Sequence, residues 1–361
     1  MSPAEAASPC LPDLRYVSRP RGRAARDAGA VGMTRVRVAV DAMGGDRAPE
    51  EIVAGALAAR SDTVEPVLFG RRELLEPIAE GLDIFHAPTV VGMHEKPADA
   101  AREKRDSSLF AACRAVGEGD ADVVVSAGNT GALLAAGLLE IRRLPDVYRP
   151  ALAVPIPAQR GPSVLIDAGA NADARPEHLL QFGYMGSIFA EEILEIEEPE
   201  VKLLSIGEEP DKGNRLTREA HPLLVASGLR FAGNTESRDL LAGAADVVVC
   251  DGFTGNVVLK SLEGTIMTVL SALREEMLES RRGKVGGLLI RGAARGLKRR
   301  LDPDTYGGAY LLGLRGLLVK AHGNSSRAAI ANAIALGARG VSGGVVARLA
   351  GRLGDHAGLR R

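Results

Sequence analysis

VRVAVDAMGGDRAP, residues 36–49, is the stretch that decides the fold of this chain. An apolar run ends at Asp41, and two adjacent glycines, Gly44 and Gly45, and a second acid, Asp46, follow before a helical pattern begins. A strand, a polar loop and a helix in this order begin an α/β unit. The glycines lack the GxGxxG spacing of a conventional dinucleotide-binding loop, so the loop serves another ligand.

The same pattern recurs along the chain. Short apolar runs alternate with longer helical patterns, and runs such as VVV fit strands that are buried on both faces. The predicted strands are 36–40, 66–70, 122–127, 151–156, 163–168, 201–207 and 246–252, and the predicted helices include 49–60, 129–143, 176–193 and 254–279. This alternation predicts a mostly parallel sheet with helices on both faces.

Polar residues gather where five of these strands end. The loops are DAMGGD after the first strand, then SAGNTGA, DAGAN, SIGEEPDKGN and DGFTGN. Because open α/β sheets bind ligands at the carboxyl ends of their strands, we expect the five loops to lie on one edge and to form one site. Ordinary turn chemistry explains any single loop equally well, but the five together favour a site.

Two of the loops predict an anion site. Gly128, Asn129 and Thr130 lead directly into an Ala/Leu-rich helix, and Thr254 and Asn256 open the long helix that carries Lys260 one turn later. Backbone N–H groups at helix N-termini bind phosphate or a developing oxyanion. Lys212 adds a mobile positive charge, and the basic run 102–105 either adds more or is a solvated face.

Composition excludes several classes of protein. A net charge of -1 gives no global attraction to nucleic acid, and 3% aromatic residues with no Trp leave few stacking platforms. The three cysteines have no CxxC spacing, so neither a disulfide framework nor a metal site is expected, and a reducing cytoplasm fits. No apolar run reaches the roughly 18 to 20 residues that span a bilayer.

The chemistry that remains uses no nucleophilic side chain. GxSxG, HExxH and GxxxxGK[ST] motifs are absent, and no histidine falls in the five loops. Cys250 ends an apolar strand, where a thiol is more often packing than a nucleophile. Inorganic phosphate is itself a nucleophile, and a thioester's thiolate leaves easily because the pKa of an ordinary thiol is roughly 8.5. Positioning and oxyanion stabilisation would then supply most of the catalysis.

From about Arg35 to about Leu336 the sequence closely resembles the PlsX family of phosphate acyltransferases. The resemblance is carried by the ordered set AVDAMGGD, EKPADAAREKRDSS, VSAGNTGALLAAG, IDAGAN with QFGYMG, SIGEEPDKGN, DVVVCDGFTGNVVLKSLEG, and DPDTYGGAYLLG with AHGNSS. It implies a three-layer α/β/α fold related to isocitrate dehydrogenase and phosphotransacetylase, and a homodimer. It also implies transfer of a long-chain acyl group from acyl carrier protein to inorganic phosphate, without a cofactor. The acyl phosphate would pass to a glycerol-3-phosphate acyltransferase.

Carried onto this chain, the resemblance assigns candidate site residues. Lys212 is predicted to neutralise phosphate or transition-state charge, and Asn256 to donate to the thioester oxyanion. Their alternatives are a surface lysine and a helix cap. The predicted phosphate and substrate residues are Asp41, Gly44, Gly45, Asp46, Arg47, Ser126, Gly128, Asn129, Thr130, Asp167, Asn171, Asp251, Thr254 and Lys260. Asp41 and Asp46 are expected to orient neighbouring donors rather than touch the anion.

One position departs from the family pattern. Arg47 stands where the family commonly has histidine, in GGDRAP instead of GGDHAP. A general base is therefore not expected there, whereas a guanidinium is suited to binding phosphate.

Three segments complete the domain plan. Residues 1–34 are predicted to be a disordered tail, and Met33 is a candidate start. The acyltransferase domain is placed at 35–340, and a C-terminal helix and tail at 341–361. Within 280–302, the stretch KVGGLLIRGAARGLKRRL (284–301) predicts a helix with Ile290, Ala293, Ala294, Leu297 and Leu301 on one face and Arg291, Arg295 and Lys298 beside it. Such a segment either lies on an anionic membrane, as the family's peripheral membrane behaviour favours, or packs as a dimer or core helix.

Two other functions are compatible with these loops. A phosphotransacetylase that uses coenzyme A, or a phosphate-binding dehydrogenase, would share the parallel sheet and the anion loops. A non-enzymatic scaffold for lipid-synthesis proteins at the membrane surface would bind membranes and partners without turnover.

Overall fold

The computed structural model describes residues 35–355 apart from 160, 302–304 and 306. The predicted tail at 1–34, with its candidate start, and the last residues of the predicted C-terminal tail lie outside the described residues. Within the described part, α12 (Val345–Asp355) lies in the C-terminal segment.

One 11-stranded sheet organises the molecule, in the order β3-β2-β1-β4-β11-β10-β5-β6-β9-β7-β8. The strands of its first part are β1 (Val36–Asp41), β2 (Val64–Gly70), β3 (Asp83–His86), β4 (Val123–Ser126), β10 (Ala309–Leu312) and β11 (Leu317–Lys320). Those of its second part are β5 (Ala151–Ile156), β6 (Ser163–Ile166), β7 (Val201–Leu204), β8 (Phe231–Thr235) and β9 (Val247–Val249). All seven predicted strands are present; β3, β8, β10 and β11 were not predicted.

Strand direction reverses in the middle of the sheet. β1, β2, β3, β4 and β11 run parallel, β10 is antiparallel to both of its neighbours, and β5 is antiparallel to β6. β6, β9, β7 and β8 are parallel to one another and therefore opposite to β1. The expectation that all five polar loops lie on one edge is wrong. The loops after β1 and β4 lie on one edge, and those after β6, β7 and β9 on the other.

Helices cover both faces, as the alternation of strand side chains requires. Val38 and Val40 of β1 belong to one apolar core and Ala39 to the other. On the first face lie α1 (Glu50–Ala59), α6 (Pro176–Ile193), α7 (Arg215–Val225), α11 (Arg327–Ser342) and α12. On the second lie α3 (Pro97–Glu103), α4 (Ser108–Glu118), α5 (Thr130–Ala136), its π-helical continuation η1 (Gly137–Ile141) and the start of α8 (Gly252–Glu279). Two short helices, α2 (Arg72–Leu75) and η2 (Ser237–Asp239), lie in connections.

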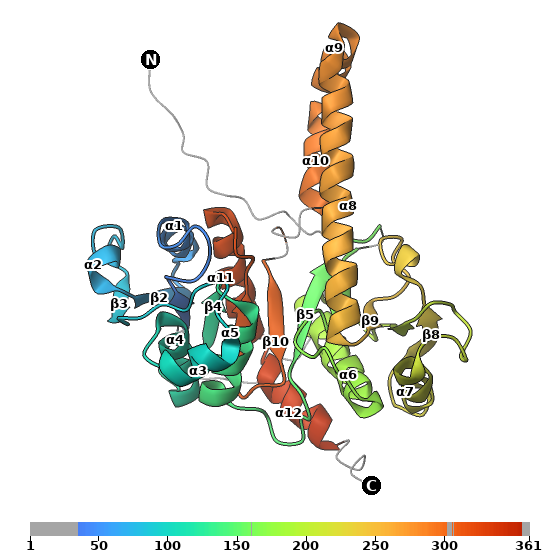
Figure 1. Ribbon diagram of the computed structural model, residues 1–361, viewed down its shortest axis with the longest axis horizontal. Helices are drawn as coiled ribbons and strands as arrows, with labels where there is room; N and C mark the ends of the chain where they lie inside the picture. Colours follow the sequence, from blue (N-terminus) through green and yellow to red (C-terminus); the bar gives the residue numbers. More distant parts are fainter. Residues whose placement is uncertain (1–34, 160, 302–304, 306, 356–361) are drawn as a thin grey trace, which may run out of the picture. The chain divides into compact units, whose positions relative to one another are not determined.

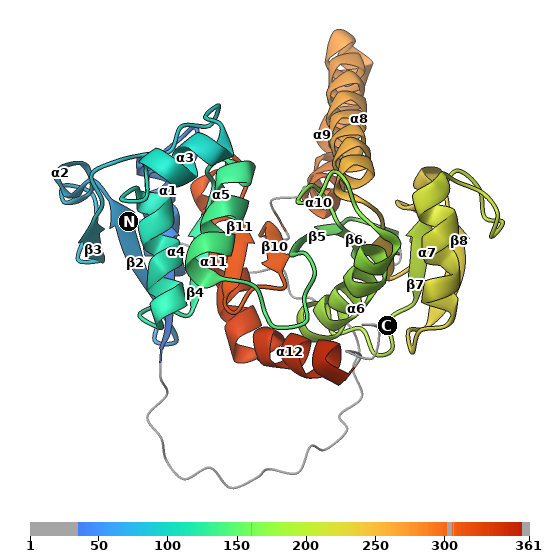
Figure 2. The same cartoon turned by 60° about the horizontal axis from the view of Figure 1, so that its bottom comes forward.

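The three helices α8, α9 (Arg281–Leu289) and α10 (Arg291–Leu301) form a stalk that projects from the sheet (Figures 1 and 2). The predicted single helix over 284–301 is instead two helices, because α9 ends at Leu289 and α10 begins at Arg291. Exposed apolar side chains continue from Leu288 and Leu289 along α8 at Met267, Val269 and Leu273.

α8 is also long and apolar enough to cross a bilayer. It has 28 residues, an 18-residue window reaches a mean hydropathy of 1.2, and 6% of that window is buried. Lys260 and Glu263 interrupt its apolar sequence, so α8 reaches this hydropathy as an average and not as an unbroken apolar run. Length and composition alone are weak evidence for a span, because core helices of soluble proteins meet them too.

Candidate functional site

Three adjacent parallel strands, β1, β4 and β11, bring Asp41, Ser126 and Lys320 to one edge of the sheet. Lys320 pairs in register with Ser126, and β4 lies between β1 and β11. β1 is followed in the chain by β2 on one side of it, whereas β4 pairs with its other side. Open α/β sheets bind ligands at such a reversal of strand order.

Asp41 is the buried centre of this edge. Its side chain is 2% exposed, and Oδ2 accepts a 2.7 Å hydrogen bond from Ser126 Oγ, which in turn accepts one from Gly128 N–H at 3.0 Å. Oδ1 is buried without a hydrogen-bond partner within the described residues. Burial raises the pKa of the Asp41 carboxyl, and the hydrogen bond from Ser126 partly opposes that shift.

Gly44 explains one of the two adjacent glycines in DAMGGD. A Cβ at this position would collide with Asp41 Oδ2 and lie 2.9 Å from Gly128 N. The loops after β1 and β4 therefore touch through backbone, which only glycine permits here. Arg47, at the exposed end of the same loop, lies near the Glu51 carboxylate.

The loop after β11 closes this edge. Asp46 N–H donates to Gly323 O at 2.7 Å, and Ala321 N–H donates to Ser126 O at 2.9 Å. Lys320 is partly buried, and its Nζ donates to Ala321 O. Burial, together with the positive charge of Lys260, lowers the pKa of Lys320 to about 8, while Asp41 and Asp46 oppose the shift.

At the other edge, the loop after β6 is held by its own side chains. Asp167 accepts hydrogen bonds from the backbone of Leu152, Gly169 and Ala170 and from both the N–H and the amide of Asn171. The Asn171 amide also donates to Pro150 O at 2.7 Å. Burial raises the pKa of Asp167. These two side chains shape the loop; that they also bind substrate stays a prediction.

The start of α8 packs directly against that loop. Asp251 is its N-cap and accepts from Thr254 N–H at 2.9 Å and from Thr254 Oγ1 at 2.7 Å. A Cβ on Gly255 would collide with Asp167 O, so this helical glycine permits the close approach. Because Asp251 and Thr254 cap the helix, the cap role considered for Asn256 does not apply.

Asn256 faces the gap between α8 and the loop after β6. A Cβ on Gly169 would lie 3.6 Å from Asn256 Cβ, and the Asn256 amide has no hydrogen-bond partner within the described residues. Lys260 lies four residues further, on the same face of the helix and about 6 Å along its axis. The amide and the ammonium therefore lie beside each other along α8.

α8 joins the two edges of the sheet into one site. Glu263 accepts from Lys260 Nζ at 2.7 Å, and its other oxygen lies 3.4 Å from His322 Nε2 in the loop after β11. The helix thus carries Asn256 at the second edge and Lys260 at the first. The loop after β6 packs against the start of this helix, and the loop after β11 contacts it one turn beyond Lys260.

Lys212, Asn129 and Thr130 have other surroundings. Lys212 is exposed, its stem packs over Gly207, and its ammonium has no ion pair in the described part of the chain. Asn129 caps α5 by accepting from Ala132 N–H at 3.0 Å, and its amide donates to Met93 O and Glu95 O. Thr130 is exposed at the first residue of that helix. No contact brings Lys212 to Asn256 among the described residues.

Cys250 is buried in the sheet. It is 2% exposed, its Sγ lies 3.5 Å from Asp167 O, and burial raises the thiol pKa well above its ordinary value. A thiol that is not readily ionised is a poor nucleophile, so packing is its role.

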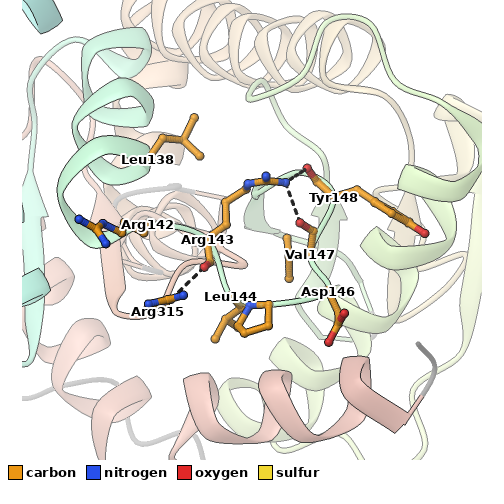
Figure 3. Close-up of a pocket in the computed structure, with 9 residues that line it drawn as sticks. Leu138, Arg142, Arg143, Leu144, Asp146, Val147, Tyr148 and Arg315 are labelled. Carbon is orange, nitrogen blue, oxygen red and sulfur yellow. Dashed lines mark hydrogen bonds between the residues drawn. The ribbon is translucent and has the colours of Figure 1, made fainter. Parts of the chain in front are cut away.

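A separate cavity of about 540 Å³ lies beside the connection from η1 to β5 (Figure 3). Its arginines support the loop: Arg143 donates to Val147 O and Tyr148 O, and Arg315 donates to Arg143 O. None of the predicted site residues lines this cavity.

Sequence reasoning missed Lys320, His322 and Glu263 as site residues. AHGNSS is among the motifs that carry the family resemblance, but the predicted strands do not include β11, which positions it. The signal was present, because LLVK leads into AHGNSS as VRVAVD leads into AMGGD.

The chain matches one family model, described as fatty acid synthesis protein, over residues 36–348. A phosphate acyltransferase of Heliobacterium modesticaldum is 45% identical over 323 residues, which is 87% of this chain and 96% of that protein. A phosphate acyltransferase of Geobacter sulfurreducens is 46% identical over 326 residues, 88% of this chain and 94% of that protein.

Solved structures show the same fold at low sequence identity. A phosphotransacetylase from Streptococcus pyogenes has a TM-score of 0.59 at 16% identity, and the match covers 85% of this chain and 94% of that one. A branched-chain phosphotransacylase from Enterococcus faecalis has a TM-score of 0.54 at 16% identity, with 85% and 99% covered. The predicted mostly parallel three-layer fold of the phosphotransacetylase type is confirmed.

Proposed function

The chain belongs to the fatty acid synthesis protein family, the PlsX family of phosphate acyltransferases, and from this premise we propose that it transfers a long-chain acyl group from acyl carrier protein to inorganic phosphate. The product would be acyl phosphate, a donor for a glycerol-3-phosphate acyltransferase. The single observation that carries the proposal is the placement of Asn256 and Lys260 on one face of α8. They lie between the loop after β6 and the loop after β11.

The reaction needs no nucleophilic side chain. An oxygen of phosphate attacks the thioester carbonyl carbon, a C–O bond forms, and the carbonyl oxygen becomes an oxyanion. The C–S bond then breaks, and the thiolate leaves with the bonding electrons. Inorganic phosphate supplies the nucleophile, so the protein needs only to position it and to stabilise the oxyanion.

Different residues position the phosphate and stabilise the oxyanion, according to where they lie along α8. Lys260 and the loops after β1 and β4 lie at the phosphate end of α8, and the Asn256 amide, which has no other partner within the described residues, donates to the oxyanion. Lys212 lies in the loop after β7, one strand beyond β9, and supplies a mobile positive charge when substrate is bound. Asp251 and Thr254 fix the helix from which Asn256 and Lys260 project.

The stalk supports a peripheral membrane role. α10 carries basic residues, among them Arg291 and Arg295, and exposed Leu288 and Leu289 lie just before it. Basic residues beside exposed apolar side chains bind anionic bilayers, where the product has its lipid tail. We place the protein in the cytoplasm, in contact with the membrane surface, as a homodimer that buries part of the apolar α8 surface.

A product assay with several acyl donors tests this function. Purified full-length protein is mixed with palmitoyl-loaded acyl carrier protein and phosphate, and carrier thiol and acyl phosphate are followed together. Phosphate-dependent, equimolar formation of both is expected. Thiol release without acyl phosphate means hydrolysis, activity with palmitoyl-coenzyme A alone means a phosphotransacetylase, and membrane binding without turnover means a scaffold.

A further inference from the structure

The loop after β11, which contains AHGNSS, has no role in the function proposed above. It nevertheless lies at the same edge as the loops after β1 and β4. β11 is the parallel neighbour of β4, and the loop is fixed by hydrogen bonds from Asp46 N–H to Gly323 O and from Ala321 N–H to Ser126 O. Lys320 is thus positioned by backbone beside Ser126.

The ammonium of Lys320 is incompletely satisfied. An ammonium has three donors, and within the described residues Lys320 Nζ makes one hydrogen bond, to Ala321 O. Its charge interacts unfavourably with that of Lys260 in α8 and favourably with the carboxylates of Asp41 and Asp46. A partly buried cation close to a second cation is costly unless an anion joins them.

A second observation in the same cluster also points to a ligand. Asp41 Oδ1 is buried and accepts no hydrogen bond within the described part of the chain. Buried polar atoms in native structures nearly always have a partner. Hydrogen phosphate brings both what Lys320 lacks, negative oxygens, and what Oδ1 lacks, an O–H donor.

A purely structural role for Lys320 explains less. Neutralising Asp41 and Asp46 would need only a nearby charge, but Lys260 and Lys320 both lie near this edge. Glu263, which binds Lys260, also holds His322 of the same loop and so anchors α8 to it.

We propose that Lys320 binds the inorganic phosphate, together with Lys260, at the edge of the sheet formed by the ends of β1, β4 and β11. This inference rests on the proposed function, because it names the residue that receives the phosphate of that reaction. The ammonium contacts phosphate oxygens that do not attack the thioester, so its removal weakens phosphate binding and leaves binding of the acyl donor intact.

Direct phosphate binding separates this inference from the proposed function. Binding of inorganic phosphate to the full chain is measured by calorimetry without an acyl donor, for the wild type, Lys320→Met, Lys320→Arg and Lys202→Met. Lys202 of β7 is a partly buried strand lysine on the opposite part of the sheet and serves as the matched control. Lys320→Met is expected to raise the phosphate Kd at least about tenfold, and Lys202→Met to leave it unchanged.

The pH dependence of phosphate binding distinguishes direct binding by Lys320 from a purely structural role of this residue. Phosphate binding by the wild type is expected to weaken as pH rises through about 8, where Lys320 loses its proton. Arginine stays protonated, so a Lys320→Arg protein whose longer side chain reaches the anion should keep its phosphate affinity as pH rises through about 8. This comparison also serves if Lys320→Met does not fold.

The outcomes are distinct. A folded Lys320→Met protein with an unchanged phosphate Kd, or a Lys320→Arg protein with the wild-type loss of binding above pH 8, overturns the inference. If the wild type binds phosphate through Lys320 but transfers no acyl group, the inference stands and the proposed function fails. If turnover is present and the phosphate KM of Lys320→Met is unchanged, the function stands and the inference fails.

Discussion

The side-chain amide of Asn256 has no hydrogen-bond partner within the described part of the chain, although it lies near the start of a capped helix. Asn256 is exposed, so its amide is accessible to substrate, and we expect it to serve the oxyanion. Asn256→Ala should therefore lower kcat by about a hundredfold or more and leave the phosphate KM within about twofold. Steady-state kinetics measure both, and Thr265→Ala, at an exposed position of the same helix, is the control. Equal losses in the two variants would remove Asn256 from the chemistry.

Lys212 is the second residue on which the proposed mechanism depends. Its exposed ammonium has no ion pair within the described residues, so substitution removes charge without leaving a buried group unpaired. Lys212→Ala is expected to lose turnover about a hundredfold with little change in thermal stability. Turnover within about twofold of the wild type would leave Lys212 as an ordinary surface lysine.

Residue roles were predictable where the sequence pattern alone sets the position. Asp41, Gly44 and Ser126 lie together because each stands at or just after the end of a strand that the apolar pattern revealed. Lys320 was not predicted, because its strand follows the glycine-rich segment 307–316 and was not separated from it. Asp167 and Asn171 have a role that no pattern shows, since the number of donors to one carboxylate depends on the folded loop.

At the scale of the element, α8 positions the site and its N-cap holds it. Asp251→Ala removes the hydrogen bonds to Thr254 and should lower the free energy of unfolding by about 1 kcal/mol. Because Asn256 and Lys260 follow directly, kcat/KM should fall as well. Urea denaturation and kinetics measure the two effects.

Ser280→Ala is the matched control for that substitution. Ser280 caps α9 through a 2.8 Å hydrogen bond from Gly283 N–H, far along the stalk from Asn256. A similar or smaller loss of stability with unchanged kcat/KM is expected. A fall in kcat/KM as large as that of Asp251→Ala would mean that helix stability, and not the position of Asn256, governs the rate.

The stalk is the element on which membrane binding depends. Arg291→Glu combined with Arg295→Glu replaces positive charge on α10 and should abolish flotation with vesicles of anionic lipid. Activity with soluble acyl carrier protein should remain. The double charge reversal Arg230→Glu with Arg238→Glu, placed away from the stalk, is the control. Unchanged recovery of the α10 variant on anionic vesicles would contradict the membrane role.

The element boundaries came largely from the hydrophobic pattern, and strand direction did not. Pro176–Ile193 matches its predicted range, and Glu50–Ala59 differs by one residue at each end. The five loops were wrongly expected on one edge because β5 and β6 were taken to be parallel. Residues 157–162 connect them, which is too short for the crossover that parallel strands need. The short connection between the two strands therefore indicates an antiparallel pair.

At the scale of the whole molecule, the reversed sheet requires a long-range connection to complete a site. Polar loops lie at both edges, and α8 crosses from the end of β9 to the loop after β11. The catalytic arrangement therefore depends on packing between segments that lie far apart in sequence, such as Glu263 and His322. The sequence pattern predicts where the loops lie along the chain, but it does not predict which of them are close together in the folded protein.

The central claim is that phosphate itself attacks the thioester and that no acyl group is held on the protein. Rapid-quench measurement of thiol release from palmitoyl-loaded acyl carrier protein, with and without phosphate, and the intact mass of the protein test it most directly. The account predicts no burst of thiol and no mass increase when phosphate is absent. A stoichiometric burst without phosphate, with a palmitoyl group found on Cys250 or any other side chain, would contradict it.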